Sequence, residues 1–243
     1  MTLPTDADAP PPDDAPLAPG PPAADPAPRA GRPTCPRCTR PLRACLCRWI
    51  TPTDHAVEVL VLQHPAERHH AKGSARLLQL SLRHCRCEVG EHFGAQALEW
   101  WLHAPATADP GGPPRRALLL YPESPKGDAP DGPTRVPPPS VPLAEPGAWR
   151  LVLLDGTWRQ AHRLLQAHPA LQRLPRWGLP TPPPSRYTVR KARRAEQRST
   201  LEAACLALGA LEGRHAPFEP LLAAFDAWVA AQMDWRRGGP GPG

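Results

Sequence analysis

Three short runs dominated by apolar residues most constrain what this chain can fold into. They cover residues 57–62, 117–121 and 151–154, and a polar segment follows each of them. Nearly continuous apolar runs are typical of parallel strands that are buried on both faces of a sheet. Because these runs alternate with helical patterns, the sequence predicts an α/β fold with a mostly parallel sheet flanked by helices.

The run at 151–154 passes through Asp155, Gly156 and Thr157 directly into a helical pattern that begins at Trp158. A strand that ends in this way places polar groups at the carboxyl edge of the sheet, where ligands of open α/β folds usually bind. The alternative is that Asp155 or Thr157 only caps the following helix, as Asp and Thr often do. At this point both interpretations stay open.

Capping signals predict two helices elsewhere in the chain. Gly73 and Ser74 precede a leucine-rich helical pattern, with Ser74 as the expected N-cap. Residues 199–202, Ser-Thr-Leu-Glu, have the capping-box pattern of a second helix. Further helices are predicted over residues 96–103 and 218–235.

Composition separates the ends of the chain from its body. Residues 1–33 hold 11 of the 38 prolines and almost no large apolar side chains, so they cannot bury enough surface to fold. We predict a disordered tail at 1–33, a cysteine-rich segment at 34–48, one folded domain at 49–237 and a flexible tail at 238–243.

The body of the chain is strongly basic. Five aspartates and Arg29 give residues 1–31 a net charge of −4, which leaves +10 for the rest of a chain whose total is +6. Such a body suggests a polyanionic partner, most often nucleic acid. The basic run at 186–198 abuts a helix start and predicts a site for RNA phosphate or a ligand carboxylate, the alternative being a solvated face.

Four of the seven cysteines lie within thirteen residues, as Cys35-x2-Cys38 and Cys45-x-Cys47. This spacing favours structural zinc over free surface thiols. Cys85, Cys87 and Cys205 are predicted to be small core residues. An odd number of cysteines, no apolar span and no signal peptide predict a soluble, cytoplasmic protein with no membrane association.

Taken in order, the motifs resemble those of the DTW domain family, which looks like a branch of the SPOUT-like, knotted α/β methyltransferase superfamily. The resemblance runs from about Cys35 to Trp235. It implies transfer of the 3-amino-3-carboxypropyl group of S-adenosylmethionine to N3 of a tRNA uridine, with release of methylthioadenosine. tRNA is then the partner, and no protein partner is implied. The alternatives are an S-adenosylmethionine-dependent RNA methyltransferase and a non-catalytic RNA-binding module that uses zinc and basic residues.

The resemblance also implies roles for individual residues. Asp155 is the expected base for the N3 proton, Thr157 a polar contact to the donor, and Trp158 either a stacking partner of a ring or an aromatic core anchor. The expected donor-binding residues are Tyr121, Pro122, Leu154, Gly156, Tyr187, Arg190, Ser199, Thr200 and Glu202. The expected RNA-binding residues are Gln63, His64, Glu67, Ser74, Arg76, Arg193 and Arg194, together with three arginines of the cysteine-rich segment, Arg37, Arg40 and Arg43.

Overall fold

The computed structural model describes residues 33–68, 73–106, 109–122, 137–179 and 198–236. Its centre is one sheet of five strands in the order β2-β1-β4-β3-β5, and every neighbouring pair is parallel. The strands are β1 (Glu58–Gln63), β2 (Cys85–Val89), β3 (Arg116–Leu120), β4 (Trp149–Asp155) and β5 (Arg176–Trp177). The predicted parallel α/β fold is therefore confirmed, and the knot implied by the resemblance stays a prediction.

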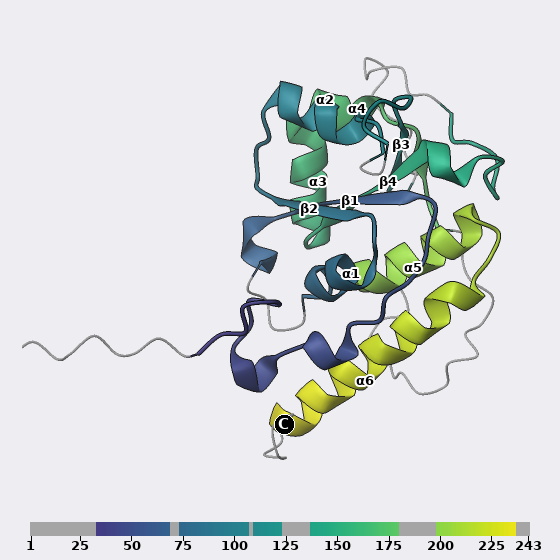
Figure 1. Ribbon diagram of the computed structural model, residues 1–243. Coiled ribbons are helices and arrows are strands. Elements are labelled where there is room, and N and C mark those ends of the chain that lie inside the picture. The colour runs from purple at the N-terminus through teal and green to yellow at the C-terminus, as the bar shows by residue number, and fades with distance from the viewer. Residues whose placement is uncertain (1–32, 69–72, 107–108, 123–136, 180–197, 237–243) are drawn as a thin grey trace, which may run out of the picture. The chain divides into compact units, whose positions relative to one another are not determined.

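Helices cover both faces of this sheet (Figure 1). On one face lie α2 (Ala95–His103), α3 (Trp158–Ala167) and α4 (Pro169–Arg173), and on the other α1 (Ala75–Ser81), α5 (Thr200–Leu211) and α6 (Glu219–Arg236). All helices predicted from capping and periodicity are present at nearly the expected residues. Among the described helices, none combines the length and the apolar character that crossing a membrane requires.

The two faces of the sheet bury alternate side chains of the same strands. In β1, Val59 and Val61 pack toward α1 and α5, whereas Leu60 and Leu62 pack toward α2 and α4. All six residues of β1 are buried, which explains why the strand reads as an almost continuous apolar run.

Two features of the fold were missed by the sequence patterns. The strand β5 has only two residues, which is too few for a periodicity. Residues 124–147 are rich in Pro, Gly and Asp, a composition that predicts a surface loop. Leu143 in this stretch is nevertheless buried, and its amide donates to the carbonyl of Leu211 at 2.8 Å. That prediction was wrong for Leu143, because one apolar side chain in a polar segment is enough to attach it to the core.

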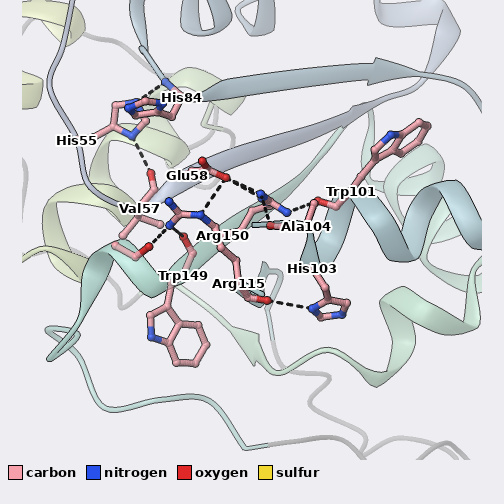
Figure 2. A network of polar contacts seen from close by, with 11 residues as sticks. His55, Val57, Glu58, His84, Trp101, His103, Ala104, Arg115, Trp149 and Arg150 are labelled. Atoms are coloured by element: carbon pink, nitrogen blue, oxygen red, sulfur yellow. Dashed lines mark hydrogen bonds and ion pairs between the residues drawn. The ribbon is translucent and has the colours of Figure 1, made fainter. Parts of the chain in front are cut away.

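A buried charge network holds the amino edge of the sheet (Figure 2). Arg150 on β4 forms an ion pair with Glu58 on β1 at 2.5 Å. The same guanidinium donates to the carbonyls of Trp101 and Ala104 at the end of α2, at 2.6 and 3.0 Å. Arg115 approaches Glu58 from the other side, at 3.2 Å. This network lies at the edge opposite to the predicted site, and we assign it a structural role.

Candidate functional site

Asp155 and Gln63 are brought together by strand register at the carboxyl edge of the sheet. β1 and β4 are neighbours, and Gln63 lies directly opposite Asp155 in their pairing. The side-chain amide of Gln63 donates to Oδ2 of Asp155 at 2.7 Å. Both side chains are almost completely buried, each residue being 7% exposed. The carboxylate therefore lies in a polar cluster below the surface of this edge.

The start of α5 completes this cluster. The hydroxyl of Thr200 donates to Oδ1 of Asp155, the oxygen that Gln63 leaves free. Ser199 caps α5, and Glu202 accepts from the amide of Ser199 at 2.9 Å, which confirms the predicted capping box. The residues expected to bind the donor at this helix start thus make contacts within the protein.

Ser74 joins two helices at this edge. It precedes α1 as predicted, but its side chain makes no capping bond to α1. Its hydroxyl oxygen instead accepts from the amide of Leu201 in the first turn of α5, at 3.3 Å. Ser74 is therefore the N-cap residue of α1 as predicted, but its hydroxyl oxygen accepts from a free amide at the start of a neighbouring helix rather than from α1.

Thr157 caps α3, whereas Asp155 does not. The Thr157 hydroxyl accepts from the amide of Gln160 at 3.3 Å, and the Gln160 side chain accepts from the amide of Thr157 at 2.7 Å. The preceding Gly156 lies so close to this pair that an added Cβ would stand 3.0 Å from Cβ of Gln160. Of the two capping candidates in the sequence, Thr157 is the cap and Asp155 is left for other contacts.

Tyr121 and Trp158 meet on the side of the sheet that carries α3. Their ring centroids are 5.9 Å apart in an edge-on arrangement. Trp158 is 58% exposed, so it is not the aromatic core anchor that the sequence left open. Pro122 follows Tyr121 as an exposed residue near Gly178, and Leu154 is half-buried on the same side.

His64 follows Gln63 and forms a pair that sequence patterns missed. Its Nδ1 accepts from the amide of Ala66 at 3.2 Å, so the proton is on Nε2, which lies 3.1 Å from a carboxylate oxygen of Glu91. Its own amide donates to the carbonyl of Asp155 at 2.9 Å. No local pattern links His64 to Glu91, because the loop after β2 brings Glu91 to this edge. Glu67 is half-buried in the turn after His64.

Of the three cysteines outside the N-terminal cluster, Cys205 is buried in the core, whereas Cys85 and Cys87 are half-buried and pack against it. Burial raises the pKa of Cys205 to about 12. Burial, reinforced by the nearby charge of Asp155, raises the pKa of Cys87 to about 12 as well, and burial also raises the pKa of Cys85. All three stay protonated near neutral pH and are unsuited to nucleophilic attack.

The four N-terminal cysteines converge as the sequence predicts. The sulfur atoms of Cys35, Cys38, Cys45 and Cys47 all lie within 4.8 Å of one another. Sγ of Cys35 is 3.6 Å from that of Cys47, and Sγ of Cys38 is 3.7 Å from that of Cys45. Four thiolates at about 2.3 Å from one zinc ion are about 3.8 Å apart in a tetrahedron. The cluster therefore fits a structural zinc site.

Backbone hydrogen bonds favour the thiolate form of one of these four cysteines. The bond from Cys38, followed by that from Arg37, lowers the pKa of Cys35 to about 6. A thiolate is the form that binds zinc. The chain thus favours the ionised ligand at the first position of the cluster.

Two arginines attach this cysteine knuckle (residues 34–48) to the rest of the fold. Arg40 donates to the carbonyl of Gly73 at 2.9 Å, and its guanidinium lies 5.0 Å from the ring centroid of Trp228 on α6. Arg76 donates from α1 to the carbonyl of Arg37. Both contacts end in the segment that contains Ser74, so the knuckle lies beside the helix starts at the carboxyl edge.

Four predicted site residues lie outside the described residues: Tyr187, Arg190, Arg193 and Arg194. Among the described candidates, Gln63, His64 and Thr200 contact Asp155. Ser74 and Ser199 contact the first turn of α5, which contains Glu202.

Comparison with known proteins identifies the family of this chain. The DTW domain family matches residues 32–233. A tRNA-uridine aminocarboxypropyltransferase 2 of Drosophila melanogaster is 33% identical over 204 residues, covering 79% of this chain and 71% of the fly protein. The protein of the same name in Mus musculus is 30% identical, covering 83% of this chain and 64% of its own length, and that of Macaca fascicularis is 27% identical, with 85% and 65% covered. No solved structure matches the chain significantly.

Proposed function

Because the chain belongs to the DTW domain family, we propose that it transfers the 3-amino-3-carboxypropyl group of S-adenosylmethionine to N3 of a uridine in tRNA. The names of its relatives support the acceptor and the transferred group. The observation that carries the proposal is the buried carboxylate of Asp155 at the carboxyl edge of the sheet, where open α/β folds bind their ligands.

The proposed reaction is a single displacement. N3 of uridine forms a bond to the terminal propyl carbon of the donor while the bond between that carbon and sulfur breaks. The electron pair of the broken bond goes to sulfur, which becomes the neutral thioether of methylthioadenosine. The N3 proton goes to a carboxylate base. Because the leaving thioether needs no proton, one carboxylate is sufficient.

Asp155 is the base in this proposal. A carboxylate offers about four lone-pair positions, and the bonds from Gln63 and Thr200 occupy one on each oxygen. Positions therefore remain for the uridine proton.

The remaining candidates divide by their location. Trp158 is exposed beside Tyr121 and can stack on a base or on the donor's adenine. Gly156 lets the chain pass close to α3, and Leu154 and Pro122 flank the same side. We propose that this side receives the donor. The basic residues Arg193 and Arg194 bind tRNA phosphates in this proposal, and the zinc-bound cysteine knuckle also contacts the RNA.

The nucleoside by-product tests this function. Purified protein incubated with S-adenosylmethionine and unmodified tRNA is expected to release methylthioadenosine in step with tRNA modification. Accumulation of S-adenosylhomocysteine instead would show methyl transfer and contradict the proposal. Salt-sensitive binding of tRNA without any by-product would identify a non-catalytic binding module.

Asp155→Asn tests the base assignment. The amide keeps the size of the side chain but cannot accept the N3 proton as a carboxylate does. We expect a loss of transfer of at least about a hundredfold, with tRNA affinity nearly unchanged. Full activity of Asp155→Asn would remove Asp155 from the chemistry.

A further inference from the structure

We propose that Gln63 and Thr200 are positioning residues that orient the Asp155 carboxylate, rather than contacts to tRNA or to the donor. This inference rests on the proposed function, because it gives these two side chains a role in the same transfer. It replaces the roles that the resemblance implies for them, namely RNA binding for Gln63 and donor binding for Thr200.

The two donors act on different oxygens from different elements. Gln63 reaches Oδ2 from the neighbouring strand β1, at 2.7 Å, and Thr200 reaches Oδ1 from the start of α5. A carboxylate held by one donor can still turn about its terminal bond, whereas two donors on opposite oxygens fix the plane of the group. The directions of the remaining lone pairs are then fixed relative to the sheet edge.

Gln63 itself is rigidly held. It is the last residue of β1, its carbonyl accepts from the amide of Gly90 at 3.0 Å, and only 7% of the residue is exposed. Its amide lies against Asp155 because strand register places the two residues opposite each other. Reaching a bulky RNA would require Gln63 to give up this buried hydrogen bond.

Thr200 is placed by a helix start that three contacts hold in position. Glu202 accepts from both the amide and the hydroxyl of Ser199, at 2.9 and 2.7 Å, and Ser74 accepts from the amide of Leu201. The Thr200 hydroxyl therefore projects from a fixed first turn toward Asp155. Small displacements of a catalytic group can lower the rate about a hundredfold. Holding the Asp155 carboxylate in place with two hydrogen bonds would therefore contribute to catalysis.

Gln63→Met and Thr200→Val remove one donor each at nearly constant size. We expect each variant to lower kcat about tenfold or more, while KM for tRNA and for S-adenosylmethionine changes less than about twofold. Thr200→Ser keeps the hydroxyl and is expected to recover most of kcat. Gln172→Met, a glutamine change on α4 away from this edge, is the matched control, and thermal unfolding of each variant verifies that it is folded.

The outcomes separate this inference from the proposed function. If the unmodified chain releases methylthioadenosine but Gln63→Met and Thr200→Val keep full kcat, the positioning role is wrong and the function stands. A rise in KM for either substrate with unchanged kcat would show direct substrate contacts and equally contradict positioning. A loss of kcat in Thr200→Val that Thr200→Ser does not recover would overturn the role of the hydroxyl. If the unmodified chain itself yields no transfer product, it is the proposed function that fails.

Discussion

Arg76 on α1 donates a hydrogen bond to the backbone carbonyl of Arg37 in the cysteine knuckle, with 2.5 Å between nitrogen and oxygen. The same guanidinium donates to the side chain of Gln79 at 2.7 Å, which fixes its direction. Ser74, the residue immediately before α1, contacts the start of α5. The knuckle and the carboxyl edge of the sheet are therefore joined through the first turn of α1.

Removing this arginine tests the connection. Arg76→Met is expected to lower the free energy of unfolding by about 0.5–1.5 kcal/mol, because one exposed and one partly buried hydrogen bond of the guanidinium are lost. It should also speed the release of zinc to a chelator. Denaturant unfolding and chelator kinetics measure the two effects. Arg163→Met, an exposed change on α3, is the control and should alter neither. Unchanged stability of Arg76→Met would show that the bond to Arg37 contributes nothing.

The cysteine knuckle should contain zinc in the purified protein. We expect close to one zinc ion per chain by elemental analysis, and Cys38→Ser should lose it, because this buried sulfur contacts that of Cys45 at 3.7 Å. Cys205→Ala lies outside the cluster and should keep the metal even if its core packing is weakened. Full zinc content in Cys38→Ser would contradict the four-cysteine site.

His55 is expected to make stability dependent on pH. Its Nε2 accepts from the amide of His84 at 3.1 Å, so its Nδ1 carries the proton and donates to the carbonyl of Val57 at 2.7 Å. The ring is thus neutral, and burial lowers its pKa below the ordinary 6.5, against the opposing effects of the Val57 carbonyl and Glu212. In acid the unfolded chain binds the proton more readily than the folded one. The stability contribution is full above about pH 6.5 and is lost as the pH falls through the lowered pKa.

Unfolding by urea at several pH values measures this contribution. The slope due to one histidine is at most about 1.4 kcal/mol per pH unit. His55→Asn keeps a donor for Val57 but cannot titrate, so its stability should vary less with pH between about 6.5 and 5. His162→Asn, on the exposed side of α3, should keep the full dependence. An equal slope in His55→Asn and the unmodified chain would exclude His55 as its source.

Trp158 should contribute to substrate binding without contributing to the core. Trp158→Ala is expected to weaken tRNA or donor binding by about 1–3 kcal/mol, the usual value of one stacked ring, while the free energy of unfolding changes by less than about 1 kcal/mol. Trp100→Ala removes another exposed tryptophan, 63% exposed on α2, and should leave binding unchanged. Binding and unfolding measured on both variants decide the matter, and strong destabilisation of Trp158→Ala would indicate a packing role instead.

The sequence predicted features that depend on neighbouring residues in the chain, but it did not predict the contacts between strands across the sheet. The capping boxes at Thr157 and Ser199 involve residues three positions apart, so they can be recognised from the chain itself. The contact between Gln63 and Asp155 joins residues 92 positions apart and depends on which strands are neighbours. Nothing in either local pattern predicts that register.

The side chain of Ser74 illustrates the same limit. Its position before α1 follows from local chemistry, but its bond to Leu201 depends on how α1 and α5 approach each other. The cysteine knuckle was predictable because its ligands are close in sequence, whereas its attachment through Arg40 and Arg76 was not. The sequence shows the motifs of the candidate site separately, and only the fold shows that they lie together at one edge of the sheet.

Isotope transfer into tRNA tests the central claim most directly. The purified chain would be incubated with unmodified tRNA and with S-adenosylmethionine labelled either in its aminocarboxypropyl carbons or in its methyl group, and the tRNA nucleosides would be analysed by mass spectrometry. The proposed function predicts a modified uridine that carries the aminocarboxypropyl label and never the methyl label. A uridine that carries the methyl label, or tRNA that gains neither label, would contradict it.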